Sequence, residues 1–273
     1  MKTIEVLLKD LLADGVDKLQ IVADFDGTLT KDFIDGQKVQ SIISVLRDHP
    51  GYLSSDYQIV AKQLFAEYAP FENDLSISYE DRLAKMHEWW TKHFDLLIKS
   101  GLKLEHIEQV ATSGIIQFRD GAKEFLKLTH ELKIPVIIFS ASGLGEALSI
   151  YCQHEGVVYD NIHFVTNSFK WGEKGEAIAA NEPIIHSLNK NEEVIQGIDN
   201  MKKVVENRQN VLLLGNSLGD LEMSKGSHNK KLVTIAFVDK EQGKCDWCQK
   251  FDALATDYQE INNSLTSLKS VLV

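Results

Sequence analysis

The sequence predicts an α/β protein with a Rossmann-like parallel sheet and a helical unit inserted after the first strand. Three observations predict this fold. Five short apolar runs have the length and β-branched composition of strands buried on both faces of a parallel sheet. Helical patterns lie between most of these runs. The gap between the first two runs is far too long for an ordinary crossover connection.

The five apolar runs are the predicted strands of the sheet. Helical patterns at 121–133 and 143–156 flank the second run. Strands that alternate with helices are joined by right-handed crossovers, so the carboxyl ends of the strands meet along one edge. The runs cover 19–26, 134–142, 162–169, 210–216 and 231–238.

The stretch between the first two runs predicts helices and no strand. We expect these helices near 35–48, 56–69, 78–99 and 103–113. The predicted division is therefore a catalytic core formed by 1–32 and 119–273, with a helical cap domain at 33–118. Open α/β sheets bind ligands at the carboxyl edge of their strands, and an insertion at that edge can act as a lid.

Composition and charge narrow the classes of partner. The formal net charge is −11, so the protein as a whole repels nucleic acid and anionic membranes. No stretch approaches the ~20 apolar residues that span a bilayer. Residues 1–15 form an amphipathic helical pattern with acidic residues inside it, unlike the apolar core of a signal peptide. We expect a cytoplasmic monomer or weak homodimer that binds no nucleic acid and no membrane.

The cysteine content argues against a disulfide framework. The chain has three cysteines, and two of them, Cys245 and Cys248, form the sequence "CDWC". A single CxxC is compatible with half a zinc site or a redox pair. No second CxxC or HxxxH accompanies it, which favours two reduced thiols in a loop or at a helix start.

Polar residues end three of the predicted strands. Asp24 and Asp26 end the first run, Ser140 and Ser142 the second, and "GNSLGD" the fourth. Strand ends also carry such residues simply to make turns, but three sets at one edge indicate a site. Carboxylate and carbonyl oxygens suit Mg²⁺. A carboxylate can accept a phosphoryl group, and a second carboxyl can exchange protons with the leaving oxygen. The pattern therefore favours phosphoryl transfer.

Several motifs resemble those of a known family. "DFDGTLT", "FSAS" and "GNSLGD" resemble motifs of the haloacid dehalogenase superfamily. Together with "HEWWTKHF" and "HSLNKNEE", in this order and spacing, they are similar to the cytosolic pyrimidine 5′-nucleotidases, the type III soluble enzymes. The resemblance covers most of the chain. It implies the haloacid dehalogenase fold with a cap and a nucleotide as substrate.

The resemblance assigns the chemistry to particular residues. It implies that Asp24 is the nucleophile and that Asp26 is the acid and base. Ser140 and the amide of Ala141 hold the phosphate. Lys190, in "SLNK", pairs with Asp24 and the phosphate. Without the resemblance, a lysine between polar neighbours is most simply a solvated surface residue.

The implied Mg²⁺ site contains one departure from the family. Asp24, the backbone carbonyl of Asp26, and Asp220 are implied ligands. The family normally has an aspartate where this chain has Asn216. An amide offers an oxygen but no charge, and metal affinity depends on ligand charge. We therefore expect weaker Mg²⁺ binding than the family pattern implies.

Two residues of the insertion are candidates for nucleoside binding. The resemblance implies that Trp90 flanks the nucleobase and that Glu72, in "PFEND", contacts the nucleoside. Adjacent helical residues are about 100° apart, so Trp89 cannot share the position of Trp90, and we expect it in the core of the insertion. The alternatives are that both tryptophans are packing residues and that Glu72 is a solvated carboxylate.

The favoured function is a Mg²⁺-dependent 5′-nucleotidase that hydrolyses nucleoside 5′-monophosphates, with pyrimidines preferred, through a phospho-aspartate. Two alternatives stay open. One is a phosphatase of the same fold that acts on other small molecules. The other is a nucleotide-binding protein with little turnover because of Asn216. Transfer of the phosphoryl group to an acceptor nucleoside is also compatible with the motifs.

Overall fold

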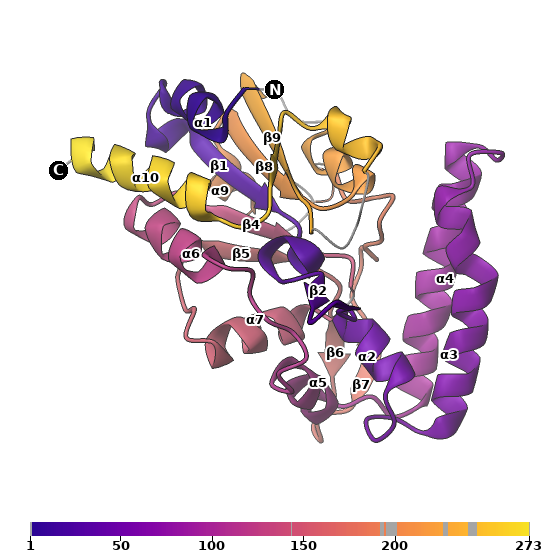
Figure 1. Ribbon diagram of the computed structural model, residues 1–273. Helices are drawn as coiled ribbons and strands as arrows, with labels where there is room; N and C mark the ends of the chain where they lie inside the picture. The colour runs from indigo at the N-terminus through magenta and orange to yellow at the C-terminus, as the bar shows by residue number, and fades with distance from the viewer. Residues whose placement is uncertain are drawn as a thin grey trace.

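The computed structural model contains a parallel six-stranded sheet as its centre (Figure 1). It describes residues 2–142, 144–191, 194, 201–225, 229–239 and 245–272. The strand order is β10-β9-β8-β1-β4-β5, and every neighbouring pair is parallel. The strands are β1 (Leu19–Ala23), β4 (Val136–Phe139), β5 (Ile162–Val165), β8 (Asn210–Gly215), β9 (Lys231–Phe237) and β10 (Ala253–Ala255).

The five predicted strands are confirmed as β1, β4, β5, β8 and β9. The sixth, β10, was not predicted because three residues make no recognisable apolar run. Alternation along β1 separates the two faces of the sheet. Ile21 and Ala23 belong to one hydrophobic cluster, and Val22 belongs to the other. Both faces are buried, which explains why this strand is a continuous apolar run.

Helices cover both faces of the sheet (Figure 1). The cluster on one face includes residues of the helices that begin and end the chain, and α9 contributes Met201 to the other cluster. The predicted helices at the N-terminus and beside the second strand are confirmed. These helices are α1 (Ile4–Leu12), α6 (Ala122–Glu131) and α7 (Gly145–His154), and the structure adds α9 (Met201–Val205) and α10 (Gln259–Leu272), which were not predicted.

The insertion contains four helices close to the predicted positions. They are α2 (Ile42–Asp48), α3 (Ser55–Tyr68), α4 (Tyr79–Lys99) and α5 (Leu104–Ala111). Ser54 and Ser78 cap α3 and α4, because each side chain accepts a hydrogen bond from the first turn. The α3–α4 pair forms a long hairpin that stands to one side of the sheet (Figure 1).

The prediction that the insertion has no strand was wrong. β2 (Phe33–Ile34) and β3 (Gln37–Lys38) form a short antiparallel hairpin. Asp35 and Gly36 join them with φ of 52° and 75°, and an Asp-Gly pair favours this kind of tight turn. The first helix of the insertion therefore begins at Ile42, later than predicted.

A second short hairpin comes from the core half of the chain but contacts the insertion. It consists of β6 (Phe169–Trp171) and β7 (Ala177–Ala180). The Ala177 N–H donates to the Leu102 carbonyl at 2.8 Å, and the Leu104 N–H donates to the Gly175 carbonyl at 3.0 Å. The division at 32 and 118 stays a prediction, and this hairpin shows that contacts cross it.

The structure corrects the interpretation of the cysteine pair. Cys245 and Cys248 form a disulfide with Cα atoms 5.4 Å apart, at the start of the short helix η6 (Trp247–Lys250). The predicted helix start is therefore found, but the predicted reduced thiols are not. A CxxC spacing brings the two side chains within bonding reach. No helix in the described parts of the chain is long and apolar enough to cross a membrane.

Candidate active site

The first strand delivers Asp24 to the carboxyl edge of the sheet. β1 ends at Ala23, and the Asp24 N–H donates to the Leu214 carbonyl of the neighbouring strand at 3.0 Å. The chain then turns sharply through η2 (Phe25–Leu29). Asp26 lies in this turn. The turn allows the second aspartate to stay near the first, as the sequence predicted.

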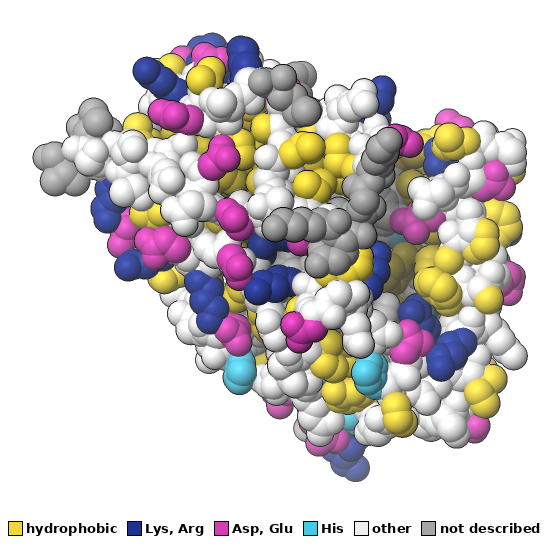
Figure 2. All heavy atoms as spheres, viewed as in Figure 1, with side chains coloured by type: hydrophobic (Ala, Val, Ile, Leu, Met, Phe, Trp, Pro, Cys, Tyr) yellow, Lys and Arg dark blue, Asp and Glu magenta, His cyan; other side chains and the backbone are white. Residues whose placement is uncertain are grey.

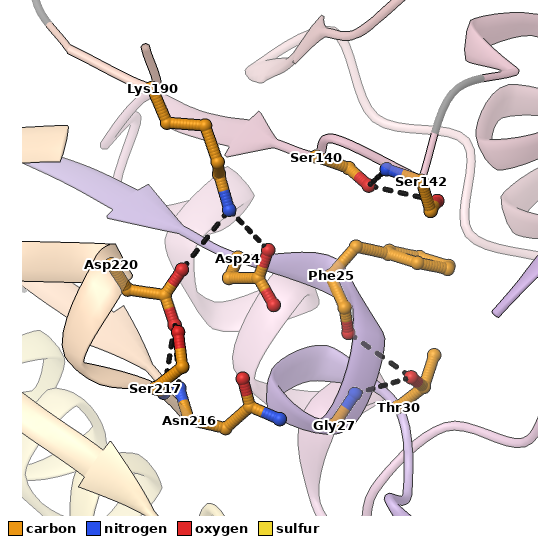
Figure 3. A network of polar contacts seen from close by, with 10 residues as sticks. All are labelled: Asp24, Phe25, Gly27, Thr30, Ser140, Ser142, Lys190, Asn216, Ser217 and Asp220. Carbon is orange, nitrogen blue, oxygen red and sulfur yellow. Dashed lines mark hydrogen bonds and ion pairs between the residues drawn. The ribbon is translucent and has the colours of Figure 1, made fainter. Parts of the chain in front are cut away.

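Hydrogen bonds fix the shape of that turn (Figure 3). Thr30 Oγ1 accepts from the Gly27 N–H and donates to the Phe25 carbonyl, both at 3.1 Å. Gly27 has φ of +73°, and a Cβ there would lie 2.0 Å from Asn216 Nδ2. Only glycine meets both conditions. The buried Arg119 donates to the Gly27 carbonyl at 2.6 Å, so a distant side chain also holds the turn.

Lys190 lies between two buried carboxylates at the centre of the site. Its Nζ is 2.6 Å from Asp24 Oδ1 and 3.1 Å from Asp220 Oδ1. All three side chains are buried. Figure 3 shows the three groups converging from different parts of the chain. The predicted pairing of Lys190 with Asp24 is present, and Lys190 is not a surface residue.

Asp220 is bound on both of its carboxylate oxygens. Oδ2 accepts from the Asn216 N–H, the Ser217 N–H and Ser217 Oγ, at 3.0, 2.9 and 2.8 Å. Oδ1 accepts from Lys190. A Cβ at Gly215 would lie 2.5 Å from Asp220 Cβ, so glycine is needed for this approach. The contacts to Oδ2 fix the position of the Asp220 carboxylate, so that its Oδ1 can orient the ammonium group of Lys190.

Burial and charge shift the protonation of these groups. Burial opposes the charge on Lys190, but Asp24 and Asp220 outweigh it and raise the pKa of this lysine above its usual range. Burial also raises the pKa of Asp24, while Lys190 acts in the opposite direction. Burial raises the pKa of Asp26 to about 6, against a hydrogen bond from Ser142. A carboxyl near this value can both give and take a proton at neutral pH.

The donor set at the edge of the sheet fits a hard cation. The site brings three carboxyl groups, those of Asp24, Asp26 and Asp220, together with the one ammonium group of Lys190. Asn216 turns its amide oxygen towards Asp24 (Figure 3). Oxygen ligands of this kind suit Mg²⁺. No group of three His, Cys, Asp or Glu in the described residues is arranged to hold a metal, so a cation at this edge would need an amide or backbone oxygen as a further ligand.

A pocket of about 200 Å³ opens beside these groups. Its walls include Asp24, Asp26, Ala141 and Ser142. Ser140 is buried behind Ser142 and does not line the pocket. Its Oγ accepts from the Ser142 N–H at 3.1 Å and contacts Ser142 Oγ at 3.0 Å. The volume suits a phosphate group with part of its ester. Of the predicted phosphate contacts, the structure exposes Ala141 to the pocket and buries Ser140.

A comparison with models of known protein families identifies the family of this chain. A model of the family described as pyrimidine 5′-nucleotidase (UMPH-1) matches residues 27–271. The chain belongs to this family. It is a phosphoric monoester hydrolase of the 5′-nucleotidase class, and the predicted resemblance is confirmed.

Relatives within the family cover most of the chain. A mouse protein named 7-methylguanosine phosphate-specific 5′-nucleotidase is 32% identical over 86% of this chain and 78% of its own length. The chicken protein of the same name is 30% identical over 87% of this chain and 83% of its own length. A worm protein from Caenorhabditis elegans, a putative cytosolic 5′-nucleotidase 3, is 30% identical over 80% of this chain and 58% of its length.

Solved structures support the fold. Cytosolic 5′-nucleotidase IIIB bound to cytidine superposes with a TM-score of 0.79 and 28% identity, covering 97% of this chain and 90% of that one. A phosphoserine phosphatase solved as a phospho-aspartyl intermediate analogue gives a TM-score of 0.53 at 20% identity, over 90% and 97%. The haloacid dehalogenase fold predicted for this nucleotidase is therefore confirmed.

The two candidate residues of the insertion, Trp90 and Glu72, are both half-buried. Trp90 is half-buried, and its ring lies 6.4 Å from the His93 ring, nearly parallel to it. Trp89 is buried in a cluster with Tyr68 and Met86. Glu72 is half-buried in η3 (Ala69–Asn73), and its carbonyl accepts from Arg82 at 3.1 Å. Trp89 therefore packs in the insertion as expected, and the substrate roles of Trp90 and Glu72 stay predictions.

Sequence reasoning missed Arg119 in the site of this nucleotidase and assigned no role to Ser217, which it placed at the end of the fourth strand. Arg119 pairs with Asp239 at 2.7 Å while it holds the Gly27 carbonyl. Ser217 donates two of the three hydrogen bonds that Asp220 Oδ2 accepts. The spacing of Ser217 and Asp220 is that of a capping pair at a helix start, which offered a recognisable pattern. Nothing in the local sequence marks Arg119.

Proposed function

We propose that this nucleotidase is Mg²⁺-dependent and hydrolyses nucleoside 5′-monophosphates through a phospho-aspartate on Asp24. The observation that carries the proposal is the buried Lys190, whose ammonium group contacts Asp24 at 2.6 Å and Asp220 at 3.1 Å beside the pocket. A structural ion pair needs no pocket. A cation beside a carboxylate and an open phosphate-sized space is suited to phosphoryl transfer.

The proposed first step uses both aspartates. An Asp24 oxygen attacks phosphorus, and the bond from phosphorus to the ribose O5′ breaks. Asp26 gives its proton to the leaving oxygen, and the neutral nucleoside departs. The pKa of about 6 supports this role, because part of the Asp26 population is protonated near neutral pH.

The proposed second step restores both residues. Asp26, now a carboxylate, takes a proton from water as the water attacks the phospho-aspartate. The bond from phosphorus to Asp24 breaks, and inorganic phosphate leaves. Lys190, the Ala141 amide and Ser140 balance and hold the phosphate oxygens. Ser140 acts after its hydroxyl exchanges the Ser142 contact for the phosphate.

The proposed metal ligands are Asp24, the Asp26 carbonyl, Asn216 and Asp220. Mg²⁺ would neutralise phosphate charge and so let the anionic Asp24 approach. Asp24 and Asn216 support this set most directly, since their oxygens turn towards each other (Figure 3). Both Asp220 oxygens already accept protein hydrogen bonds, so Asp220 would contact the metal in addition to orienting Lys190.

The proposed substrate preference is for pyrimidine nucleotides. The family description and the cytidine bound to the 5′-nucleotidase IIIB structure support it. A second candidate is 7-methylguanosine phosphate, after which several relatives are named. A methylated guanine carries a positive charge, so an aromatic face such as Trp90 and a carboxylate such as Glu72 would favour it. We assign both residues to the nucleoside.

The wider assignments rest on the same relatives. We place the enzyme in the cytoplasm, which agrees with relatives named cytosolic. We propose a monomer or weak homodimer that acts on small molecules and binds neither nucleic acid nor membranes, consistent with a net charge of −11. Residues 33–118, together with the β6–β7 hairpin, would form the cap.

One experiment tests the proposal against its alternatives. Phosphate release is measured from CMP, UMP, 7-methyl-GMP, GMP, phosphoserine and a sugar phosphate, with Mg²⁺ and with EDTA. We expect release from CMP and UMP above the other esters, and none in EDTA. Preference for phosphoserine or the sugar phosphate would favour the general phosphatase. Nucleotide binding without release would favour the low-turnover protein, and a phosphorylated nucleoside acceptor would show transfer.

A further inference from the structure

The loop that carries Lys190 is held from two sides. We call residues 184–190 the lysine loop. On the core side, the buried Asn167 donates to the Ile185 carbonyl at 2.7 Å and accepts from the Ile185 N–H at 2.6 Å. Within the loop, Asn189 donates to the Ile184 carbonyl at 2.8 Å and accepts from the His186 N–H at 2.7 Å. These bonds fix the start of the loop and tie Asn189, the residue before Lys190, back to it.

The end of the loop is held by the insertion. Tyr79, the first residue of α4, donates its hydroxyl to the Leu188 carbonyl at 2.5 Å. The Leu188 side chain is buried in the cluster that contains Tyr68, Met86 and Trp89 of α3 and α4. Burial raises the pKa of Tyr79, so its hydroxyl stays a donor at neutral pH. Two independent contacts thus attach one residue of the loop to the helical hairpin.

Leu188 lies two residues before Lys190, whose Nζ has to reach Asp24 and Asp220 together. Lysine is a flexible side chain with a point charge. The position of its Nζ therefore depends on the position of the backbone at residue 190. A displacement of 1 Å at a reacting group can cost ~10²-fold in rate. Asn167 holds Ile185, and Asn189 bonds back to residues 184 and 186 of the same loop. The described contacts of Leu188 are with the hairpin and with His186, whose Nδ1 accepts from the Leu188 N–H at 3.3 Å.

We propose that Tyr79 and Leu188 are positioning residues for Lys190, so that the helical insertion helps to build the phosphate site as well as the nucleoside site. The proposal rests on the catalytic role proposed for Lys190. It predicts that the insertion affects every phosphate ester alike, including esters with no nucleobase. A residue that touches only the base would affect nucleotides alone.

The test compares two tyrosines of the same hairpin. Tyr79→Phe removes the hydroxyl that holds the lysine loop. Tyr68→Phe is the matched control, because its hydroxyl donates to Glu88 at 2.8 Å and accepts from Lys92 at 2.6 Å, with no bond to the loop. The substrates are p-nitrophenyl phosphate and CMP. A net hydrogen bond corresponds to roughly a three- to tenfold effect.

We expect Tyr79→Phe to lower kcat/KM by the same roughly three- to tenfold factor for both substrates, mainly through kcat. Tyr68→Phe should leave both unchanged. Loss with CMP alone would assign Tyr79 to the base and overturn the proposal. No loss with either substrate would also overturn it. If the wild type hydrolyses p-nitrophenyl phosphate but no nucleotide, the proposed substrate fails while this comparison still stands.

A second measurement does not depend on turnover. Hydrogen exchange of the backbone amides in 186–190 is compared in the wild type, Tyr79→Phe and Tyr68→Phe. We expect faster exchange in Tyr79→Phe only, confined to the lysine loop. Leu188→Met should behave as the wild type, and Leu188→Ala as Tyr79→Phe. Unchanged exchange in both Tyr79→Phe and Leu188→Ala would show that the insertion does not hold the loop.

Discussion

The centre at the edge of the sheet and the α3–α4 hairpin differ in how their functional residues are placed. At the sheet, the buried Lys190 donates to both of the buried carboxylates, Asp24 and Asp220. On the hairpin, Trp90 and Glu72 are half-buried. Figure 2 shows hydrophobic side chains on the hairpin facing a hollow between it and the rest of the molecule.

This difference distinguishes contacts that the folded chain makes by itself from contacts that form only when a substrate is bound. The chemistry uses groups that parallel strands bring to one edge, and these contacts exist without a ligand. The nucleoside contacts proposed for Trp90 and Glu72 would need a ligand to complete them. The lysine loop joins the two regions through Tyr79 and Leu188. The predictions below test whether the two regions are separable, from the largest expected effect to the smallest.

Asp24→Asn should abolish turnover of every ester, because an amide does not form the phospho-aspartate. The variant should fold, since Lys190 keeps its contact with Asp220. Phosphate release and circular dichroism are measured together, with the exposed Asp17→Asn as control. Activity near that of the wild type in a folded Asp24→Asn protein would contradict the mechanism and the comparison.

The aspartates of the sheet site were predictable because they lie next to recognisable strands, whereas Lys190 lies in a loop and was found only through the family resemblance. Asp24 and Asn216 directly follow apolar runs, so parallel topology alone brings them together. Arg119 was not predictable, because its partners Gly27 and Asp239 lie far away in the sequence. The sequence also did not show which of the two serines would be buried, because Ser140 and Ser142 both follow the same strand and only the folded structure separates them.

Short elements escaped prediction for a related reason. The strands β2, β3, β6 and β10 have two or three residues each, which is too few for an alternating pattern. β2 pairs with β3 across a two-residue turn and β6 pairs with the nearby β7, so these short strands depend on their hairpin partners, whereas β10 depends on the edge that β9 offers. The helices of the insertion were predictable because α3 and α4 are long, with serine caps at Ser54 and Ser78.

Asp26→Asn should cost ~10²–10⁴-fold with CMP, because it removes proton transfer to the leaving oxygen. The loss should be smaller with p-nitrophenyl phosphate, whose leaving group needs no proton. The measurement is kcat for both substrates. An equal loss would show that Asp26 supports the site in another way, for example through its carbonyl at the metal.

The raised pKa of Asp26 predicts a cost in stability. Its folded pKa of about 6 lies above the ordinary value of 3.8, so the folded state holds the proton more tightly. The stabilisation is complete below pH ~4 and is lost as the pH rises through ~6, by up to ~3 kcal/mol. Urea unfolding in EDTA should show Asp26→Asn more stable than the wild type at pH 8 and equal at pH 4. Equal stability at both pH values would contradict the shift.

Trp90→Ala should lower kcat/KM for CMP by roughly 5- to 150-fold, since stacking on a base corresponds to ~1–3 kcal/mol. Hydrolysis of p-nitrophenyl phosphate should change little. Trp89→Ala is the control for packing, because Trp89 is buried in the hairpin. If Trp90→Ala only lowers the melting temperature and keeps the ratio of the two substrates, Trp90 is a packing residue.

The smallest expected effect concerns Asn216, where the resemblance implies an aspartate in the family. Asn216 supplies an oxygen to the proposed Mg²⁺ site, and Asn216→Asp would add a charge. Two carboxylates repel each other when no metal is present, so the metal-free variant should be slightly less stable. A bound divalent cation is the largest local charge and outweighs that repulsion.

We therefore expect Asn216→Asp to need roughly three- to tenfold less Mg²⁺ for half-maximal activity, with a smaller change at saturating Mg²⁺. The melting temperature, followed over the same Mg²⁺ titration at fixed ionic strength, should show the same shift without reference to turnover. Leu218→Ala controls for disturbance of the loop, because this side chain is half-exposed. If Asn216→Asp needs as much metal as the wild type in both measurements, the metal lies elsewhere, and the sheet site is organised around Lys190 alone.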